Sequence, residues 1–555
     1  MGVDLQVDAR RPIAVVGLTM DIPLTTAALL RRVDTLFAHK AIVSREADGR
    51  LVRTTYGDCL AQARRLAAAM RALGVRPGDR VATFCWSHAR HLQAFYGIPA
   101  SGAILHPLNV RLPADDLAHA ITEADDAVAI VDAALWEAFV PVRRLIADRP
   151  IVVISDSGDV PVGTIDHASL LAAHEPDEFP EHDERAGAIL CHTSGTTGRP
   201  KGVLTSHRAL VLHALTQALP DMLDLSERST VLAAAHMFHA NGWGLPFSCA
   251  LVGASQVLPG ARLDAAGLVA LLESERVTHT AGVPTIAHDL LAWLDAHPGH
   301  DLSLLRTMLV GGAALPEATI RAFDERHGVR LLHSWGMTET GPLGTLARVP
   351  SELADAPADA QYAWQATQGR PAPLVEIRAR AEDGTLVPWD STTAGELEVR
   401  GPWIASSYFR SPVAGAPQAV NETRTADGWL RTGDVVTIGP TGAVSVIDRA
   451  KDLVKSGGEW ISSAALEALL LQHPAIAEAA VVAVPHDRWG ERPVAILVVA
   501  PGHEAPTLDE LHTHLADHVP RWWRPDALTI VDALPRTSSG KIRKALLRQE
   551  VTPPR

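Results

Sequence analysis

The sequence predicts an α/β protein of more than one domain, on the basis of three observations. A chain of 555 residues is longer than a single hydrophobic core usually supports. Helical patterns alternate with short apolar runs in the first part of the chain, which is typical of a parallel sheet with helical crossovers. The last hundred or so residues have the pattern of a compact α+β domain, within the usual range of domain sizes.

The alternation of helices and strands can be followed along the first half of the chain. A helix is predicted where apolar side chains recur at helical spacing, at Leu60, Ala63, Leu66, Ala67 and Met70. The turn sequence of residues 74–79 then leads into an apolar strand at 81–85. Apolar runs at 127–131 and 151–154 predict further strands of the same sheet.

Composition and charge exclude several classes of function. With 47% hydrophobic and 21% charged residues, the chain is predicted to be globular and not disordered. Its net charge of −14 argues against a general nucleic-acid binder, because phosphate backbones are held by broad basic surfaces. The long charge-free run 229–261 contains two histidines and four glycines, so we predict buried protein interior and no membrane span.

The cysteines and the start of the chain bear on the cellular compartment. The four cysteines lie far apart without a C-x-x-C pair, so neither a zinc site nor a disulfide framework is predicted. The start of the chain has charged residues and no apolar signal core. A reducing, cytoplasmic location is therefore expected.

Residues 193–202, Thr-Ser-Gly-Thr-Thr-Gly-Arg-Pro-Lys-Gly, are the most informative stretch. Hydroxyl groups, exposed backbone N–H groups and two cations together suit a polyphosphate. An apolar run precedes the stretch and a helical pattern follows it, so we predict a phosphate-binding loop that joins a strand to a helix. It lacks the Walker spacing, and a flexible surface turn is the alternative on composition alone.

This stretch resembles the phosphate loop of the adenylate-forming superfamily of acyl-CoA synthetases, peptide synthetase adenylation domains and luciferases. Three later motifs resemble the same superfamily in the same order. The resemblance implies an α/β fold with a large N-terminal domain, residues 1–450, of αβ-layered sheets and a small β-barrel subdomain. A small mobile C-terminal α+β domain, 451–555, would follow. It also implies that ATP is bound by Thr193, Ser194, Gly195, Thr196, Thr197 and Gly198, with Lys201 catalytic.

The second motif, residues 332–340, implies adenine, phosphate and metal contacts. By resemblance Trp335 covers the adenine, Gly336 and Thr338 contact the nucleotide, and Glu339 holds Mg²⁺ as a catalytic residue. Mg²⁺ commonly binds nucleotides through one or two carboxylates, which makes this role chemically sensible. Taken alone, Glu339 would more often be a solvated acid at a helix start.

The third motif, residues 427–434 with 448–452, implies a ribose site and a hinge. A carboxylate can accept hydrogen bonds from both ribose hydroxyls, and by resemblance Asp434 does so with help from Arg449. Lys451 falls at the position of the family's inter-domain hinge. Taken singly, these residues are also common in hairpins.

The segments expected around the acid substrate are less specific. By resemblance Phe238 and catalytic His239 form a gate near the carboxylate, and the acyl group meets Gly312, Ala313 and Ala314. A lone histidine in an apolar run is more often a core residue, and a glycine turn after a strand is the alternative for 312–314. His236 stands where relatives commonly have proline.

The fourth motif, 534–544, presents Lys541, which matches the family's catalytic lysine. By resemblance the pantetheine arm of CoA passes Gly457, Gly458 and Trp460, although a tight hairpin would also use paired glycines. Residues 462–463 are predicted to cap a helix, and 478–484 to form a buried strand.

These motifs together imply a ligase that activates a carboxylic acid with ATP and Mg²⁺ and transfers the acyl group to CoA. Residues 521–526 resemble medium-chain fatty acyl-CoA and methylthio-alkanoate CoA ligases, which favours an apolar acid. One alternative is a biosynthetic adenylating enzyme for an aryl or unusual small acid with another acceptor, for which His236 and Arg524 are the clues. The other is a non-catalytic sensor. A homodimer is a further expectation.

Overall fold

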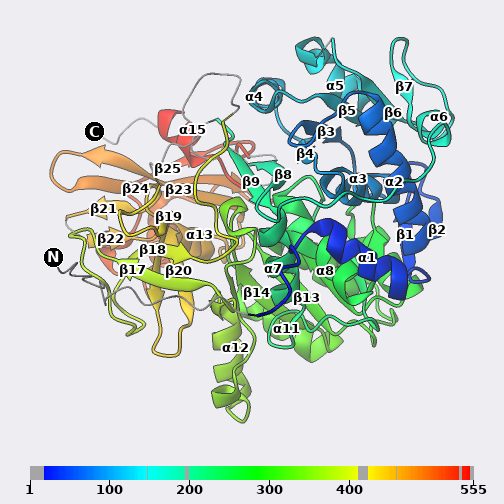
Figure 1. Ribbon diagram of the computed structural model, residues 1–555. Coiled ribbons are helices and arrows are strands. Elements are labelled where there is room, and N and C mark those ends of the chain that lie inside the picture. Colours follow the sequence, from blue (N-terminus) through cyan, green and yellow to red (C-terminus); the bar gives the residue numbers. More distant parts are fainter. Residues whose placement is uncertain are drawn as a thin grey trace, which may run out of the picture.

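The computed structural model describes residues 18–146, 148–193, 199–410, 423–457, 459–536 and 541–550 (Figure 1). In these residues the strands form four sheets. The two large sheets and the helices between them make the bulk of the protein. The other two sheets lie toward the C-terminus, which confirms the α/β class and the smaller C-terminal domain.

The first large sheet has the order β7-β6-β5-β3-β4-β8-β9. Neighbouring strands pair in parallel except β8 with β9, which confirms the predicted parallel sheet. The strands are β3 (Arg80–Phe84), β4 (Ile104–Pro107), β5 (Val128–Asp132), β6 (Ile151–Ile154), β7 (Ile165–Asp166), β8 (Gly187–His192) and β9 (Gly202–Ser206). The helices are α2 (Tyr56–Ala72), α3 (Ala89–Ala100), α4 (Ala114–Ala124), α5 (Trp136–Arg143) and α6 (His167–Ala172).

The second large sheet has the order β16-β15-β14-β13-β12-β10-β11-β1-β2 and is parallel at its centre. Its strands are β1 (Ala41–Arg45), β2 (Leu51–Thr55), β10 (Thr230–Ala233), β11 (Ser255–Leu258), β12 (His279–Gly282), β13 (Thr307–Gly311), β14 (Arg330–Trp335), β15 (Thr345–Leu346) and β16 (Arg370–Pro371). The helices are α1 (Thr26–Leu36), α7 (His207–Ala218), α8 (Leu245–Val252), α9 (Ala265–Ser274), α10 (Pro284–Ala296), α11 (Glu317–His327) and α12 (Ala358–Ala366).

One buried apolar core joins the two large sheets. It contains side chains of α1, α2, α3, α7 and α8 together with strands of both sheets, such as Leu105 of β4 and Ile42 of β1. The helices therefore form a layer between the sheets. The run 229–261 forms β10, α8 and β11 and is mostly buried, as predicted. Among the described residues, no helix combines the length and the apolar character needed to cross a membrane.

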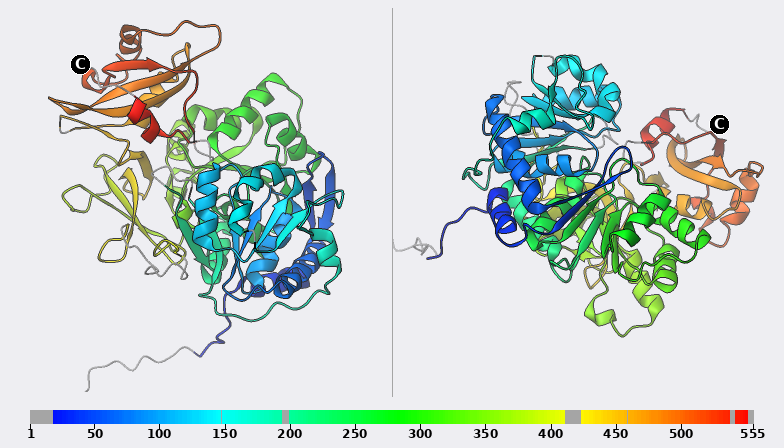
Figure 2. Two further views of the ribbon diagram at one scale, coloured as in Figure 1. Left: turned by 90° about the horizontal axis from the view of Figure 1, so that it is seen from above. Right: turned by 90° about the vertical axis from the view of Figure 1, so that its right-hand side faces the viewer.

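Two smaller sheets complete the chain. Where a small β-barrel was expected, four antiparallel strands form the order β17-β18-β19-β20: β17 (Glu376–Arg380), β18 (Gly395–Arg400), β19 (Leu430–Ile438) and β20 (Val444–Arg449). The C-terminal sheet contains β21 (Val454–Ser456), β22 (Glu459–Ile461), β23 (Ile476–His486), β24 (Gly490–Val499) and β25 (Ala527–Ile530), with α13 (Ser463–Leu470), α14 (Leu508–His514) and α15 (Lys544–Glu550). Figure 2 shows this domain, in orange and red, beside the two large sheets.

The connection after the phosphate loop differs from the prediction. The loop joins β8 to an antiparallel strand, β9, so it closes a β-hairpin and does not lead directly into a helix. The short run from Gly202 to Ser206 pairs with β8, and Ser206 then caps α7 by accepting a hydrogen bond from the Ala209 amide. A strand of this length was hidden by the stronger helical pattern that follows it.

Candidate active site

The stems of the phosphate loop are fixed by hydrogen bonds between its two ends. The Thr193 amide donates to the Lys201 carbonyl at 2.9 Å, and the Lys201 amide donates to Thr193 Oγ1 at 3.1 Å. The predicted nucleotide contacts at Ser194, Gly195, Thr196, Thr197 and Gly198 lie outside the described residues. The described ends place the Lys201 side chain at the surface of the hairpin.

Three residues predicted to hold the nucleoside lie in direct contact. The Trp335 indole at the end of β14 donates to Asp434 Oδ2 at 2.7 Å. Asp434 on β19 also forms an ion pair with Arg449 Nε at 2.5 Å, and the two residues face each other across the β19–β20 ladder. Asp434 is only 3% exposed, so both partners help to satisfy a buried carboxylate.

The turn after β14 brings the remaining residues of the second motif to this place. A Cβ atom at Gly336 would lie 1.6 Å from the Pro342 carbonyl oxygen, so only glycine fits this backbone. Thr338 and Glu339 follow in a short 3₁₀ turn, in which Glu339 is buried and Thr338 is partly exposed.

Tyr408 is a site residue that sequence reasoning missed. Its hydroxyl donates to Glu339 Oε1 at 2.6 Å, and Lys201 Nζ lies 4.7 Å from the centre of its ring. The Phe409 amide donates to the Gly202 carbonyl, and the Ala405 amide donates to the Glu339 carbonyl. This segment therefore joins the phosphate hairpin to the Glu339 turn. Only the rarity of tyrosine, four in the chain, could have drawn attention to it.

Replacing Tyr408 with phenylalanine should destabilise the protein, because it removes the hydrogen bond from the Tyr408 hydroxyl to the buried Glu339 carboxylate. We expect the free energy of unfolding to fall by about 1–3 kcal/mol in urea titrations. Tyr362→Phe is the matched control, because Tyr362 also donates to a carboxylate, Asp324, which is exposed and can bind water instead. Equal losses in the two variants would contradict a special role for Tyr408.

Lys541 of the C-terminal domain lies partly buried within range of the charges of this cluster. Burial and the charge of Arg449 lower the pKa of Lys541 to about 8, while Asp434 and Glu339 act in the opposite direction. The structure therefore brings the predicted lysine to the predicted nucleotide residues. Its amine is cationic below about pH 8 and becomes neutral above it.

This pKa predicts a pH dependence. Because only the charged amine can neutralise phosphate, the rate of pyrophosphate release at saturating ATP should fall as pH rises through about 8. The fall should be absent in Lys541→Arg, whose guanidinium stays charged, provided that this variant retains measurable turnover. A wild-type rate that is constant from pH 7 to 9.5 would contradict the prediction.

The predicted gate residues line an aromatic wall next to Lys541. Phe238 is buried and stacks on His236 at 4.8 Å, and Trp86 contacts both rings. The His236 Nε2 atom accepts a hydrogen bond from Arg111 at 3.1 Å. Burial, together with the charges of Lys541 and Arg111, lowers the pKa of His239 to about 4, so its imidazole is neutral at neutral pH.

The other predicted substrate contacts are less enclosed. Gly312, Ala313 and Ala314 follow β13 and are exposed, with Gly312 in the left-handed conformation at φ +91°. Gly457 and Trp460 lie in the β21–β22 hairpin, where the Gly457 amide donates to Trp489, and Gly458 lies outside the described residues. Within the described parts of the chain, no hydrogen bond, ion pair or ring contact joins Gly457 or Trp460 to the nucleotide residues. The structure thus places Lys541 at the site, and not the predicted CoA strand.

The donor set is consistent with a magnesium–nucleotide site and not with a protein-only metal site. No group of three or more His, Cys, Asp or Glu side chains in the described ranges could hold a metal ion. Glu339 is a single buried carboxylate beside nucleotide-motif residues, which fits Mg²⁺, since this ion takes most of its other ligands from phosphates and water.

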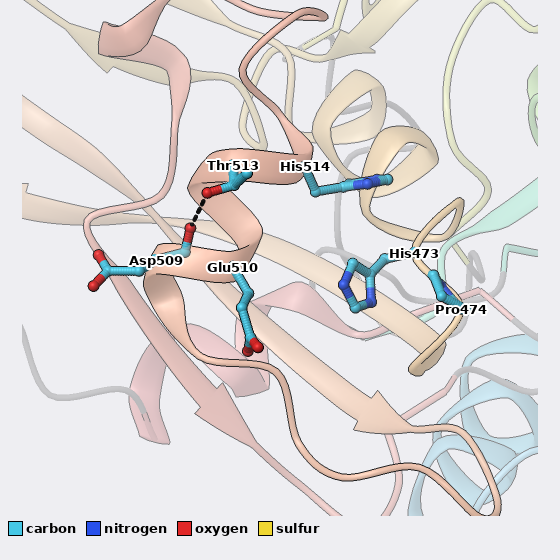
Figure 3. Close-up of a pocket in the computed structure, with 6 residues that line it drawn as sticks. All are labelled: His473, Pro474, Asp509, Glu510, Thr513 and His514. Carbon is cyan, nitrogen blue, oxygen red and sulfur yellow. Dashed lines mark hydrogen bonds between the residues drawn. The ribbon is translucent and has the colours of Figure 1, made fainter.

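A separate surface groove lies on the C-terminal domain (Figure 3). It has a volume of about 510 Å³ and is lined by His473, Pro474, Asp509, Glu510, Thr513 and His514. None of the predicted site residues lines this groove.

Comparisons with known proteins agree with this geometry. The profile of the AMP-binding enzyme family matches residues 31–409, and that of the AMP-binding enzyme C-terminal domain matches 465–541. The chain is 43% identical to a long-chain-fatty-acid–CoA ligase of Thermus thermophilus, over 96% of each chain. It is 38% identical to a medium-chain-fatty-acid–CoA ligase of Ectopseudomonas oleovorans, over 96% of this chain and 97% of the relative.

The chain is also similar to a further CoA ligase in sequence and to a solved CoA ligase in fold. The chain is 39% identical to a 3-methylmercaptopropionyl-CoA ligase of Ruegeria lacuscaerulensis, over 96% of this chain and 98% of the relative. The crystal structure of an anthranilate CoA ligase in complex with anthranoyl-AMP matches the fold with a TM-score of 0.82 and 26% identity. That match covers 96% of this chain and 98% of the other.

Proposed function

The chain belongs to the family of AMP-binding enzymes and is an AMP-forming acid–thiol ligase, and from this premise we propose that it joins an apolar carboxylic acid to CoA. Its reaction uses ATP, Mg²⁺ and CoA. One observation carries the proposal for the site: Lys541 of the small domain lies within range of the charges of Glu339, Asp434 and Arg449 of the large domain.

The first half-reaction needs charge neutralisation and alignment. A carboxylate is a poor electrophile and must be activated before a thiol can attack it. The substrate carboxylate attacks the α-phosphorus of ATP and displaces pyrophosphate, and the resulting acyl adenylate carries AMP as a good leaving group. We assign the neutralisation of phosphate charge to the loop of residues 193–202, Lys201 and Lys541. Trp335 would cover the adenine, Gly336 and Thr338 would contact the nucleotide, and Asp434 and Arg449 would hold the ribose. Mg²⁺, when bound, neutralises phosphate charge, and Glu339 would hold it.

The second half-reaction needs a different face of the small domain. We assign a boundary between residues 450 and 451, with rotation about Lys451 that withdraws Lys541 and brings Gly457 and Trp460 over the adenylate. The position of Lys541 and the separate contacts of Gly457 in this structure support that assignment. The thiol of CoA would then attack the acyl carbon and release AMP.

The apolar acid is supported by the wall beside Lys541 and by the relatives. Phe238, Trp86 and the neutral His239 offer aromatic surface near the expected carboxylate position, and Gly312, Ala313 and Ala314 offer small side chains. The named relatives act on long-chain and medium-chain fatty acids and on 3-methylmercaptopropionate. We favour a medium-chain acid.

A product analysis tests the function. Purified protein is mixed with ATP, Mg²⁺ and a series of straight-chain, thioether and aryl acids, with and without CoA, and the products are identified by mass spectrometry. CoA thioesters of apolar acids are expected, and the acid with the highest kcat/KM identifies the preferred chain length of the substrate. AMP and pyrophosphate without any thioester would overturn CoA as the acceptor, and thioesters of aryl acids alone would overturn the apolar acid.

Two finer points are also proposals. A cytoplasmic location is supported by the four buried cysteine thiols. A homodimer rests on the family resemblance, and light scattering of the purified protein tests it.

A further inference from the structure

Three buried side chains and one half-buried glutamate form a continuous hydrogen-bonded chain at the first large sheet. His106 Nδ1 lies 2.9 and 3.0 Å from the Asp126 carboxylate oxygens, and His106 Nε2 lies 2.9 Å from His192 Nδ1. His192 Nε2 lies 3.0 Å from Glu123 Oε2. The side chains of His106 and Asp126 are fully buried, that of His192 is 4% exposed, and that of Glu123 is 21% exposed. We call these residues the carboxylate–histidine chain.

The chain lies against the stems of the phosphate loop. His192 is the last residue of β8, directly before Thr193, and pairs with Gly202 across the hairpin. Glu123 belongs to α4, and one turn earlier His119 Nε2 contacts the Pro200 carbonyl at 3.2 Å. Helix α4 thus holds the incoming stem through Glu123 and the outgoing stem through His119.

The three hydrogen-bonded contacts of the carboxylate–histidine chain together require one more proton than two neutral imidazoles supply. It contains three contacts, and each needs one proton between its two heavy atoms. Two neutral imidazoles bring one N–H each, so a third proton is required. Without this proton, the lone pairs of two acceptor atoms would face each other away from water, which lowers the free energy of unfolding.

The third proton belongs on an imidazole and not on a carboxyl. An unperturbed imidazole is the stronger base by about two pKa units, and the two hydrogen-bonded rings together lie between two carboxylates. The extra proton then belongs to the hydrogen-bonded pair of rings, which donates to Asp126 through His106 Nδ1 and to Glu123 through His192 Nε2.

We propose that the carboxylate–histidine chain stores this one proton and positions the stems of the phosphate loop for ATP, with His106 and His192 as positioning residues. The inference rests on the proposed function of the loop. With the proton, two carboxylates and one imidazolium leave a charge of −1 beside the stems of the proposed phosphate loop. Without the proton the charge is −2 and one contact is broken.

The pH dependence has a defined sign. The proton is present at low pH and lost as pH rises, so the KM for ATP should rise at alkaline pH. In the described part of the chain, Asp126 and Glu123 are the titratable groups hydrogen-bonded to the two histidines, and His119 contacts the Pro200 carbonyl on the outgoing stem. Leu190 and Phe409, which lie with His192 around the Cα atom of Gly202, are apolar. We expect the KM for ATP to rise roughly three- to tenfold between pH 7 and 9, which is the effect expected from losing one hydrogen bond or adding one nearby negative charge.

Glu123→Gln separates proton storage from simple support. The glutamine amide can donate to His192 Nε2, so all three contacts are satisfied with both imidazoles neutral, and the charge stays −1. The variant should keep the wild-type KM for ATP within about twofold at pH 7 and lose its alkaline rise. Glu137→Gln, on the exposed surface of the neighbouring α5, is the matched control and should keep the wild-type profile.

A spectroscopic measurement tests the proton directly. In ¹⁵N-histidine NMR of the whole protein, one imidazole should be protonated on both nitrogens at pH 7 in the wild type and not in Glu123→Gln. His192→Gln identifies the signals by difference. Two neutral rings in the wild type, or a KM profile that Glu123→Gln leaves unchanged, would overturn the inference. A wild type that shows the imidazolium but does not bind ATP would instead overturn the proposed function, and the wild-type spectrum decides the proton even if a variant fails to fold.

Discussion

Replacing Lys541 with alanine is expected to slow acyl-adenylate formation by about 10²–10³-fold, the scale found when one preorganised donor to a developing charge is removed. Thioester formation from a supplied acyl adenylate should stay near the wild-type rate. The physical reason is that Lys541 lies with Glu339, Asp434 and Arg449 in this arrangement of the domains and would leave the site before the thiol attacks.

The two half-reactions must be measured separately. Pyrophosphate release without CoA reports the first, and mass spectrometry after addition of synthetic acyl adenylate and CoA reports the second. Arg543→Ala removes a cation two residues away and is the matched control, expected to affect neither step. Equal losses in both half-reactions of Lys541→Ala would show that the lysine has another role.

The second large effect is expected for Lys451→Pro. Lys451 lies between β20 and β21, and its carbonyl accepts a hydrogen bond from Arg548 of α15 at 2.8 Å. Proline fixes φ, so the rotation that exchanges the two faces of the small domain should be hindered. We expect adenylate formation to change little and thioester formation to slow by about tenfold or more.

Lys451→Ala is the control for this change, because it removes the side chain and keeps the backbone free to rotate. It should retain both half-reactions at close to wild-type rates. The measurement is the same pair of assays, with single-turnover mixing of CoA and preformed adenylate. An unchanged thioester rate in Lys451→Pro would place the hinge elsewhere.

The resemblance of short motifs assigned Trp335, Asp434 and Arg449 to one predicted nucleotide site, and the structure brings these three residues together. Trp335, Asp434 and Arg449 lie far apart in the chain, yet they form one hydrogen-bonded group. Composition and periodicity could not have joined them, because contacts between distant strands depend on how the sheets pack. Tyr408 escaped prediction for the same reason: its partner Glu339 lies 69 residues earlier.

The sequence by itself determined the elements whose signals are local. The apolar spacing from Leu60 to Met70 became α2, and Ser462 caps α13 through the Ala465 amide, as predicted. Side chains on one face recur with a fixed period along a helix or a strand, so these elements can be predicted from residues that are close together in the sequence. Only the tertiary structure decided that the predicted phosphate loop closes a hairpin, that Lys541 lies near the predicted nucleotide residues, and that the hydrogen-bonded pair of His106 and His192 lies between the carboxylates of Asp126 and Glu123. These outcomes depend on packing between segments that are far apart in the sequence. The residues that bury a side chain or share a proton with it therefore cannot be predicted from the sequence around it.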